Sequence, residues 1–188
     1  MQIVEVYSFN DGKAIIEQTK PAELAEVYDS IKSIDAESCR LKEPKGAERT
    51  RLKRSGETHF YSPIHLNALF EYYLLNKKWD LRPRISTHDE SREGFREMDF
   101  LKNRMGVEVQ FGKYAFLTYD IVAKMVIFKN FNIIDVGIEI CPMACMLPHM
   151  NSGIGAFEQV KWDLENRGAV KDFDVPVLLI GIAPEKLV

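Results

Sequence analysis

The chain has 188 residues, of which 46% are apolar and 28% charged, and its formal net charge is −3. This length predicts a single domain, residues 1–188, with its own core. The charge argues against a protein that coats nucleic acid non-specifically, although a specific DNA enzyme needs only a local basic cleft. Membrane spans need roughly 20 consecutive apolar residues, and none is predicted. Without a basic N-terminal region or a disulfide-like cysteine pattern, we expect a cytoplasmic protein.

Three segments organise the N-terminal third. Residues 1–7 alternate apolar and polar side chains and predict a strand. Residues 21–33 predict a helix with Pro21 in its first turn and apolar residues at helical spacing. Residues 42–58 gather lysines and arginines with few apolar side chains, which favours a solvated, mobile surface loop. The alternative is a basic arm that becomes ordered on a phosphate backbone.

A second helix is predicted to begin at Pro63, with Ser62 as its cap. Residues 87–96 are highly charged and predict a loop or a short helix. Strand-like segments follow at 98–100 and 106–111.

The C-terminal half predicts a buried helix at 114–128 and a strand covered on both faces at 133–140. A turn at 151–153 precedes a helix at 156–166, and a buried strand at 175–182 ends the pattern. Helices that alternate with strands indicate the α/β class, with a mixed central β-sheet flanked by helices.

Two acidic residues, Asp99 and Glu108, lie on the consecutive strand-like segments, and a short polar connection between them permits a hairpin. Such a hairpin would bring the two carboxylates side by side. Period-two alternation places Glu108 and Gln110 on one face of the second segment, with Val107 and Val109 on the other.

This pattern suits phosphodiester hydrolysis. Mg²⁺ prefers oxygen ligands and takes one or two protein carboxylates, so Asp99 and Glu108 could bind it with the Val109 carbonyl as a third oxygen. Gln110 could orient an attacking water, but it supplies neither a positive charge nor a useful base. The alternative is the solvated face of an amphipathic strand, and the spacing alone does not discriminate against it.

The segment 99–114, DFLKNRMGVEVQFGKY, resembles the core of the BglII/BstYI-like type II restriction endonucleases, a branch of the PD-(D/E)XK nucleases, and is most similar to the BstYI type. Similar segments occur in the same order along nearly the whole chain: IVEVYS (3–8), SIDAESCR (33–40), YSPIHLN (61–67), IDVGIEICPM (134–143), NSGI (151–154) and PVLLIGIAP (176–184). The resemblance implies one nuclease domain with the restriction-endonuclease-like fold.

It also implies that Asp99 and Glu108 are the Mg²⁺-binding acids. Gln110 would replace the lysine of the broader nuclease motif, and Met98 stands where a proline is usual.

Three residues are implied to contact DNA. Lys113 by itself would be a solvated charge, and Asn151 and Ser152 by themselves would be a helix cap. By resemblance, Lys113 would contact a base edge or a phosphate, and Asn151 and Ser152 would lie on a loop that reaches the major groove. Lys124 and Lys129 could meet phosphates or merely solvate a helix.

The activity implied is Mg²⁺-dependent cleavage of both strands of a short palindromic site in double-stranded DNA. The site would be GATC-centred with outer purine and pyrimidine bases, and the products would carry 5′ overhangs and 5′-phosphates. A two-fold symmetric site predicts a homodimer, packed through residues 114–128. A cognate DNA methyltransferase is expected in the same host without physical contact. The alternatives are a non-catalytic DNA-binding protein on a nuclease fold and a repair-type Mg²⁺-dependent nuclease.

The cysteine-containing segment has a second interpretation. Cys141, Cys145 and His149 recur every four residues, but a metal site would need a fourth ligand and a helix that nearby prolines disfavour, so buried thiols are expected. Trp79 and Trp162 are predicted to anchor the core or an interface.

Overall fold

The computed structural model describes residues 1–188 except 55, 90–91 and 167–173. A six-stranded sheet crosses the molecule in the order β1-β8-β7-β6-β5-β2. Its strands are β1 (Gln2–Phe9), β2 (Asp80–Leu81), β5 (Phe100–Lys102), β6 (Met105–Val109), β7 (Val136–Pro142) and β8 (Val177–Ala183). The central pairs β6–β7 and β7–β8 are parallel, and the outer pairs are antiparallel. The predicted mixed sheet is confirmed.

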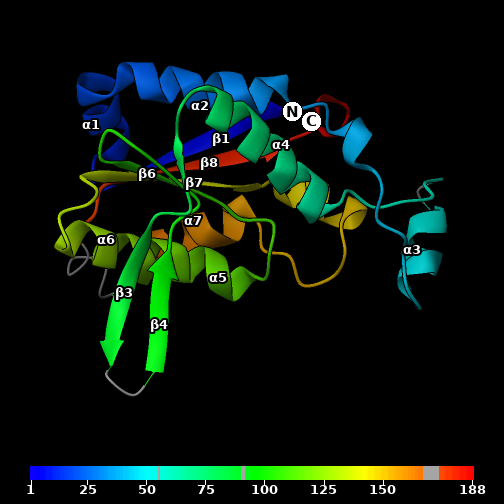
Figure 1. Ribbon diagram of the computed structural model, residues 1–188. Helices are drawn as coiled ribbons and strands as arrows, with labels where there is room; N and C mark the ends of the chain where they lie inside the picture. Colours follow the sequence, from blue (N-terminus) through cyan, green and yellow to red (C-terminus); the bar gives the residue numbers. More distant parts are fainter. Residues whose placement is uncertain (55, 90–91, 167–173) are drawn as a thin grey trace.

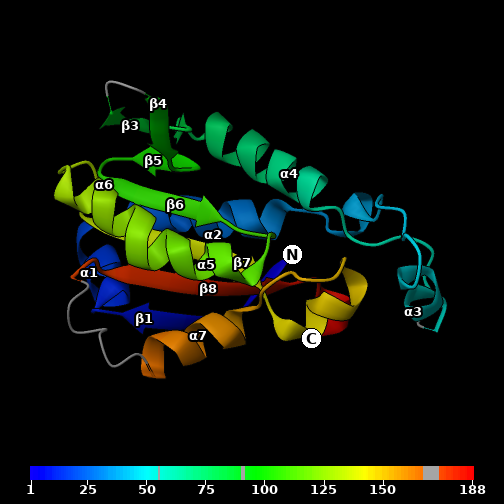
Figure 2. The same ribbon diagram turned by 90° about the horizontal axis from the view of Figure 1, so that it is seen from below.

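Helices cover both faces of this sheet (Figures 1 and 2). One face carries α1 (Gly12–Thr19), α2 (Pro21–Ser33) and α4 (Pro63–Asn76). The other carries α5 (Tyr114–Tyr119), the π-helical segment η2 (Asp120–Met125), α6 (Val126–Asn130) and α7 (Phe157–Asn166). Alternate residues of β8 enter the two cores, since Leu178 packs on the first side and Leu179 on the second. Strands buried on both faces explain the near-continuous apolar runs of β7 and β8.

Several predicted elements are confirmed. The helix at 21–33 is α2, and the strand at 1–7 is β1. The helix after Ser62 is α4, but the Ser62 side chain does not cap it; its hydroxyl pairs with His65 Nδ1 at 2.9 Å. The helix at 114–128 is present as α5, η2 and α6, with a π-helical middle that the sequence did not predict.

The prediction for residues 87–96 is wrong. A hairpin of β3 (Arg84–Asp89) and β4 (Arg92–Glu97) forms a separate two-stranded sheet that projects from the body (Figure 1). Residues 90–91 lie outside the described residues. Cross-strand contacts stabilise the hairpin, for example Arg84 Nε to Glu97 Oε2 at 2.6 Å and the Arg84 guanidinium over the Phe95 ring. Strands are recognised in a sequence by the alternation of apolar and polar residues. A hairpin with little core contact lacks this alternation, so the sequence did not indicate its strands.

The basic segment 42–58 is not all loop, because it contains α3 (Glu48–Arg54). Leu52 is 1% exposed and anchors this helix. Three short 3₁₀ helices complete the chain: η1 (Glu37–Cys39), η3 (Ala144–His149) and η5 (Glu185–Leu187). Along the described stretches, every helix is too short or too polar to cross a membrane.

The side-chain predictions outside the site have mixed outcomes. Cys141 is buried as expected, but Cys145 is exposed, because it lies on the surface of η3. Trp79 is buried and donates from Nε1 to Glu26 at 2.8 Å. Trp162 is 63% exposed, so it is not a core residue.

Candidate active site

The hairpin β5–β6 brings Asp99 and Glu108 together. Asn103 and Arg104 form its two-residue turn, and both have positive φ, as a type I′ turn requires. Phe100 pairs with Val107, so Asp99 lies opposite Glu108 at the next position. The two carboxyl groups share a hydrogen bond, and the Val109 N–H donates to Asp99 Oδ2 at 2.9 Å. The predicted juxtaposition of the acids is present.

Strand alternation in β6 separates site from core. Val107 and Val109 pack in the core on the α2 and α4 side of the sheet. Glu108 and Gln110 face the opposite side, where their partners lie on η2. Glu108 is 1% exposed, which rules out the alternative of a solvated strand face at this position.

Burial dominates the electrostatics of the two acids. It raises the pKa of Glu108 well above the usual value, and the charge of Asp99 raises it further against the opposing effect of Lys124. Burial also raises the pKa of Asp99, while the Val109 N–H and Lys124 oppose this. Two carboxyl groups in a shared, poorly hydrated place favour binding of a cation.

Three charged residues of this site, Asp120, Lys124 and Glu139, were not assigned to it from the sequence. Lys124, on η2, does not merely solvate the helix. Its Nζ lies 2.9 Å from Glu108 Oε1 and 2.7 Å from Asp120 Oδ1. Glu139, on β7, pairs in register with Glu108, is 0% exposed, and has no hydrogen-bond partner among the described residues. Burial raises its pKa well above the usual value, and the charges of Asp120 and Glu108 raise it further. The sequence did carry a signal for these residues, because each is a charged residue inside an otherwise apolar segment, where a charge is rarely buried without a role.

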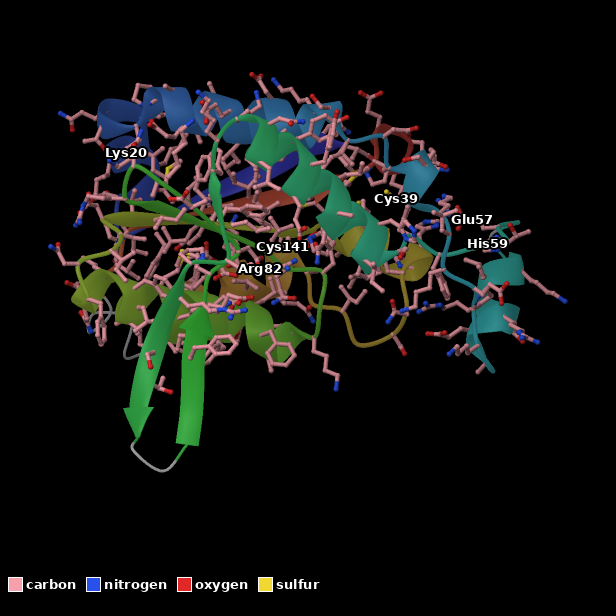
Figure 3. The ribbon with its side chains drawn as sticks, viewed as in Figure 1. Lys20, Cys39, Glu57, His59, Arg82 and Cys141 are labelled. Carbon is pink, nitrogen blue, oxygen red and sulfur yellow. The ribbon has the colours of Figure 1, made fainter. Side chains whose placement is uncertain are left out.

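A cleft of about 380 Å³ leads to Asp99 between α4 and the β5–β6 hairpin. Its wall includes Asn67, whose amide oxygen is buried without a partner in the described structure, and Arg82. Figure 3 shows Arg82 near the base of the β3–β4 hairpin, and its N–H donates to the Asp99 carbonyl at 3.0 Å. Asp99 is therefore the acid of the predicted pair that lines this cleft, together with Glu71, which pairs with Arg82.

The donor set fits a hard divalent cation. Mg²⁺ needs only one or two protein carboxylates and keeps several waters, and Asp99 with Glu108 supplies two carboxylates in contact. Within the described residues, His, Cys, Asp and Glu side chains do not gather in threes as a closed metal cage would require. The alternative metal site at Cys141, Cys145 and His149 thus has no support.

The structure also brings together the three residues predicted to contact DNA. Lys113 is exposed just beyond the site strand and forms an isolated backbone bridge with Ile154. The Gly155 N–H donates to the Gly112 carbonyl at 3.2 Å. These contacts hold the loop of Asn151 and Ser152 beside the end of β6.

Segment 42–58 is fastened to the same loop. Glu57 pairs with Arg40 Nη2 at 2.6 Å and with His149 Nδ1 at 2.6 Å. Glu48 accepts a hydrogen bond from the Ser152 N–H at 3.1 Å. Figure 3 shows Glu57 and His59 together on the connection that leaves α3. The basic helix and the loop that precedes α7 therefore form one connected unit.

Replacing Glu57 by glutamine is expected to cost about 1–2 kcal/mol of unfolding free energy at pH 7. Burial alone would raise the pKa of Glu57, but hydrogen bonds from Arg40 and His149 outweigh it and lower the pKa below 4.5. A lowered pKa contributes stability that is complete above about pH 4.5 and is lost as pH falls through the folded-state value.

Urea unfolding of both proteins at pH 7 and pH 3 measures this effect. The difference between them should shrink at pH 3. Glu43→Gln, at an exposed position of the same segment, is the matched control and should change stability by less than about 0.5 kcal/mol. An equal loss at both pH values would contradict the role of the Glu57 charge.

Comparison with known proteins gives one family and one fold. The family model described as Restriction endonuclease BglII/BglIII matches residues 4–182. The solved structure of restriction endonuclease BglII complexed with a DNA 16-mer is 21% identical, with a TM-score of 0.77 over 98% of this chain and 78% of that chain. Free BglII is 20% identical, with a TM-score of 0.67 over 98% of this chain and 81% of that chain. No curated protein sequence gave a significant match.

Proposed function

Since the chain belongs to the restriction endonuclease BglII/BglIII family, we propose that its Asp99–Glu108 site hydrolyses DNA with Mg²⁺ at a short palindromic sequence. Family membership makes the protein a type II site-specific endonuclease, a hydrolase that binds DNA. The finer proposal is a GATC-centred site cut in both strands to leave 5′-phosphate ends, by a PD-(D/E)XK enzyme of the BstYI type. A cytoplasmic location belongs to the same proposal.

The juxtaposition of the Asp99 and Glu108 carboxyls, with Asp99 lining the cleft, is the observation that carries the proposal. These carboxylates, with the Val109 carbonyl, would hold the divalent ion. When bound, the ion would polarise the scissile phosphate and lower the pKa of water. The chain itself orients Asp99 through the N–H groups of Val109 and Arg82, and it excludes water around Glu108 by burial.

DNA would lie against the same end of the molecule. Lys113 offers an exposed ammonium beside the site strand, and Asn151 and Ser152 lie on the loop bridged to that strand. Short polar side chains at this place suit contacts to base edges in the major groove.

A homodimer would present two such sites to the two strands. The helix α5 exposes Tyr114, Phe116 and Tyr119, which are 37%, 54% and 36% exposed. Exposed aromatic side chains on one helix favour burial against a partner. This supports dimer packing through residues 114–128.

Digestion of an unmodified plasmid with Mg²⁺, and with EDTA as control, tests the proposal. Discrete fragments that appear only with Mg²⁺ are expected, and sequencing their ends gives the site, the stagger and the end chemistry together. DNA binding with no cleavage would support the non-catalytic alternative. Nicking that depends on DNA structure rather than sequence would support a repair-type nuclease. Either result would overturn the proposal.

A further inference from the structure

The side-chain amide of Gln110 makes a hydrogen bond at each end. Its Nε2 donates to Asp120 Oδ2 at 3.0 Å, and its Oε1 accepts the Gly112 N–H at 2.9 Å. An amide held in this way links the end of β6 to η2. These two bonds fix the orientation of the amide, with Nε2 toward Asp120 and Oε1 toward the Gly112 backbone.

Asp120 accepts the hydrogen bond from Gln110. It is 2% exposed, and one of its carboxylate oxygens accepts Gln110 while the other pairs with Lys124. Asp120 and Lys124 both belong to the π-helical segment η2, which widens the helix where it crosses the sheet. Single π-helical turns of this kind occur frequently at functional sites. The η2 segment therefore places the Asp120 carboxylate and the Lys124 ammonium at the same end of β6.

Lys124 carries the link back to the metal-binding acids. Its ammonium contacts Glu108 at 2.9 Å and Asp120 at 2.7 Å, and its side chain is 15% exposed. An ammonium has three donors, so two contacts fix it and one remains for a further acceptor. The hydrogen-bonded chain therefore runs from Gly112 through Gln110, Asp120 and Lys124 to Glu108.

We propose that Lys124 is the cationic positioning residue of the active site, and that Gln110 acts through it rather than on a water. Gln110 fixes Asp120, Asp120 fixes the Lys124 ammonium, and Lys124 fixes the carboxylate of Glu108. The positive charge that Gln110 lacks is thus supplied from η2. This inference rests on the proposed nuclease function.

Charge balance supports the assignment. The charges of Asp99 and Asp120 both act on Glu108, and Glu139 lies beside Glu108 on β7. Among the described residues, Lys124 is the cation that forms ion pairs with Glu108 and Asp120. Removing a buried cation from such a cluster would leave carboxylates that repel one another, and the Glu108 side chain would lose the contact that fixes its position.

A double-mutant cycle tests whether Gln110 and Lys124 act as one unit. Lys124→Met should lower kcat on a cognate duplex by about 10²–10³-fold, with KM changed by less than about threefold. Gln110→Met should lower kcat by about 10–100-fold. Because both act through one chain, the double variant should equal Lys124→Met within about threefold. The matched control, Lys129→Met, removes a lysine of α6 that pairs with Asp174, and should leave kcat unchanged.

A second measurement needs no metal and no turnover. Thermal unfolding in EDTA should show a lower Tm for each single variant, by several degrees, and the two losses should not add in the double variant. If Lys124→Met does not fold, Asp120→Asn replaces it in the test, because it keeps the size of the side chain and removes the negative charge that pairs with Lys124. It should lower kcat by at least about tenfold, and its effect should not add to that of Gln110→Met.

Additive effects of Gln110→Met and Lys124→Met on both kcat and Tm would overturn the proposal, as would wild-type kcat in folded Lys124→Met. Failure of the wild-type protein to cut any duplex with Mg²⁺ would instead overturn the proposed nuclease function. In that case the double-mutant cycle in thermal unfolding with EDTA still tests whether Gln110 and Lys124 are linked through Asp120. Additive losses of Tm in that cycle would refute the link.

Discussion

Replacing Glu108 by alanine is expected to abolish DNA cleavage, a fall in rate of at least about 10³-fold, while sequence-specific DNA binding in Ca²⁺ stays detectable. Glu108 is buried, shares a hydrogen bond with Asp99, and receives the Lys124 ammonium. Its removal leaves Asp99 as the sole carboxylate of the pair, so a divalent ion would lose one of two charged ligands. The residues proposed to contact DNA, Lys113 and Ser152 among them, are left intact.

Cleavage is measured as the loss of a labelled cognate duplex with Mg²⁺ under single-turnover conditions, and binding as fluorescence anisotropy with Ca²⁺. Glu108→Gln, which keeps the side-chain volume, should be as inactive as Glu108→Ala. Glu165→Ala, at an exposed position of α7, is the matched control and should cut normally. Near-normal cleavage by Glu108→Ala would refute the assignment of the metal-binding acids.

Truncation of Phe70 to alanine is expected to cost about 3–5 kcal/mol of unfolding free energy. Phe70 is 0% exposed on α4, and its ring lies 6.3 Å from that of Phe111, just beyond β6. The change removes contacts that hold α4 on the sheet and leaves a cavity behind the site strand. For a domain with a typical stability of 5–15 kcal/mol, this is a large fraction of the total.

Urea unfolding monitored by circular dichroism measures this loss, with coincident fluorescence transitions as the test of two-state behaviour. Tyr72→Ala on the same helix is the matched control. Tyr72 is 60% exposed, so its truncation should cost less than about 1 kcal/mol. A loss below 1 kcal/mol for Phe70→Ala would show that α4 does not pack as described.

The local parts of the site were predictable from the sequence. Period-two alternation placed Glu108 and Gln110 on one face, and the short polar connection allowed the hairpin that sets Asp99 opposite Glu108. Both inferences use only neighbouring residues. The bounds of α2 were predictable for the same reason, because an initial proline and helical spacing of apolar residues are local signals.

The remainder depends on contacts between distant segments. Lys124 and Asp120 reach Glu108 only because η2 packs across β6, and Glu139 reaches it only because β7 lies beside β6 in register. A π-helical segment also departs from the 3.6-residue period on which helix recognition relies. The β3–β4 hairpin was missed because charged side chains, rather than apolar ones, line its strands.

The backbone bridge between Lys113 and Ile154 ties the Asn151–Ser152 loop directly to the end of the strand that carries Glu108. If this loop reads DNA bases as proposed, an incorrect base that displaces the loop would also displace the carboxylate through a rigid connection. Discrimination between DNA sequences would then be expressed mainly in the rate of the chemical step and less in the affinity of the complex. Such coupling would let the protein bind non-cognate DNA without cleaving it.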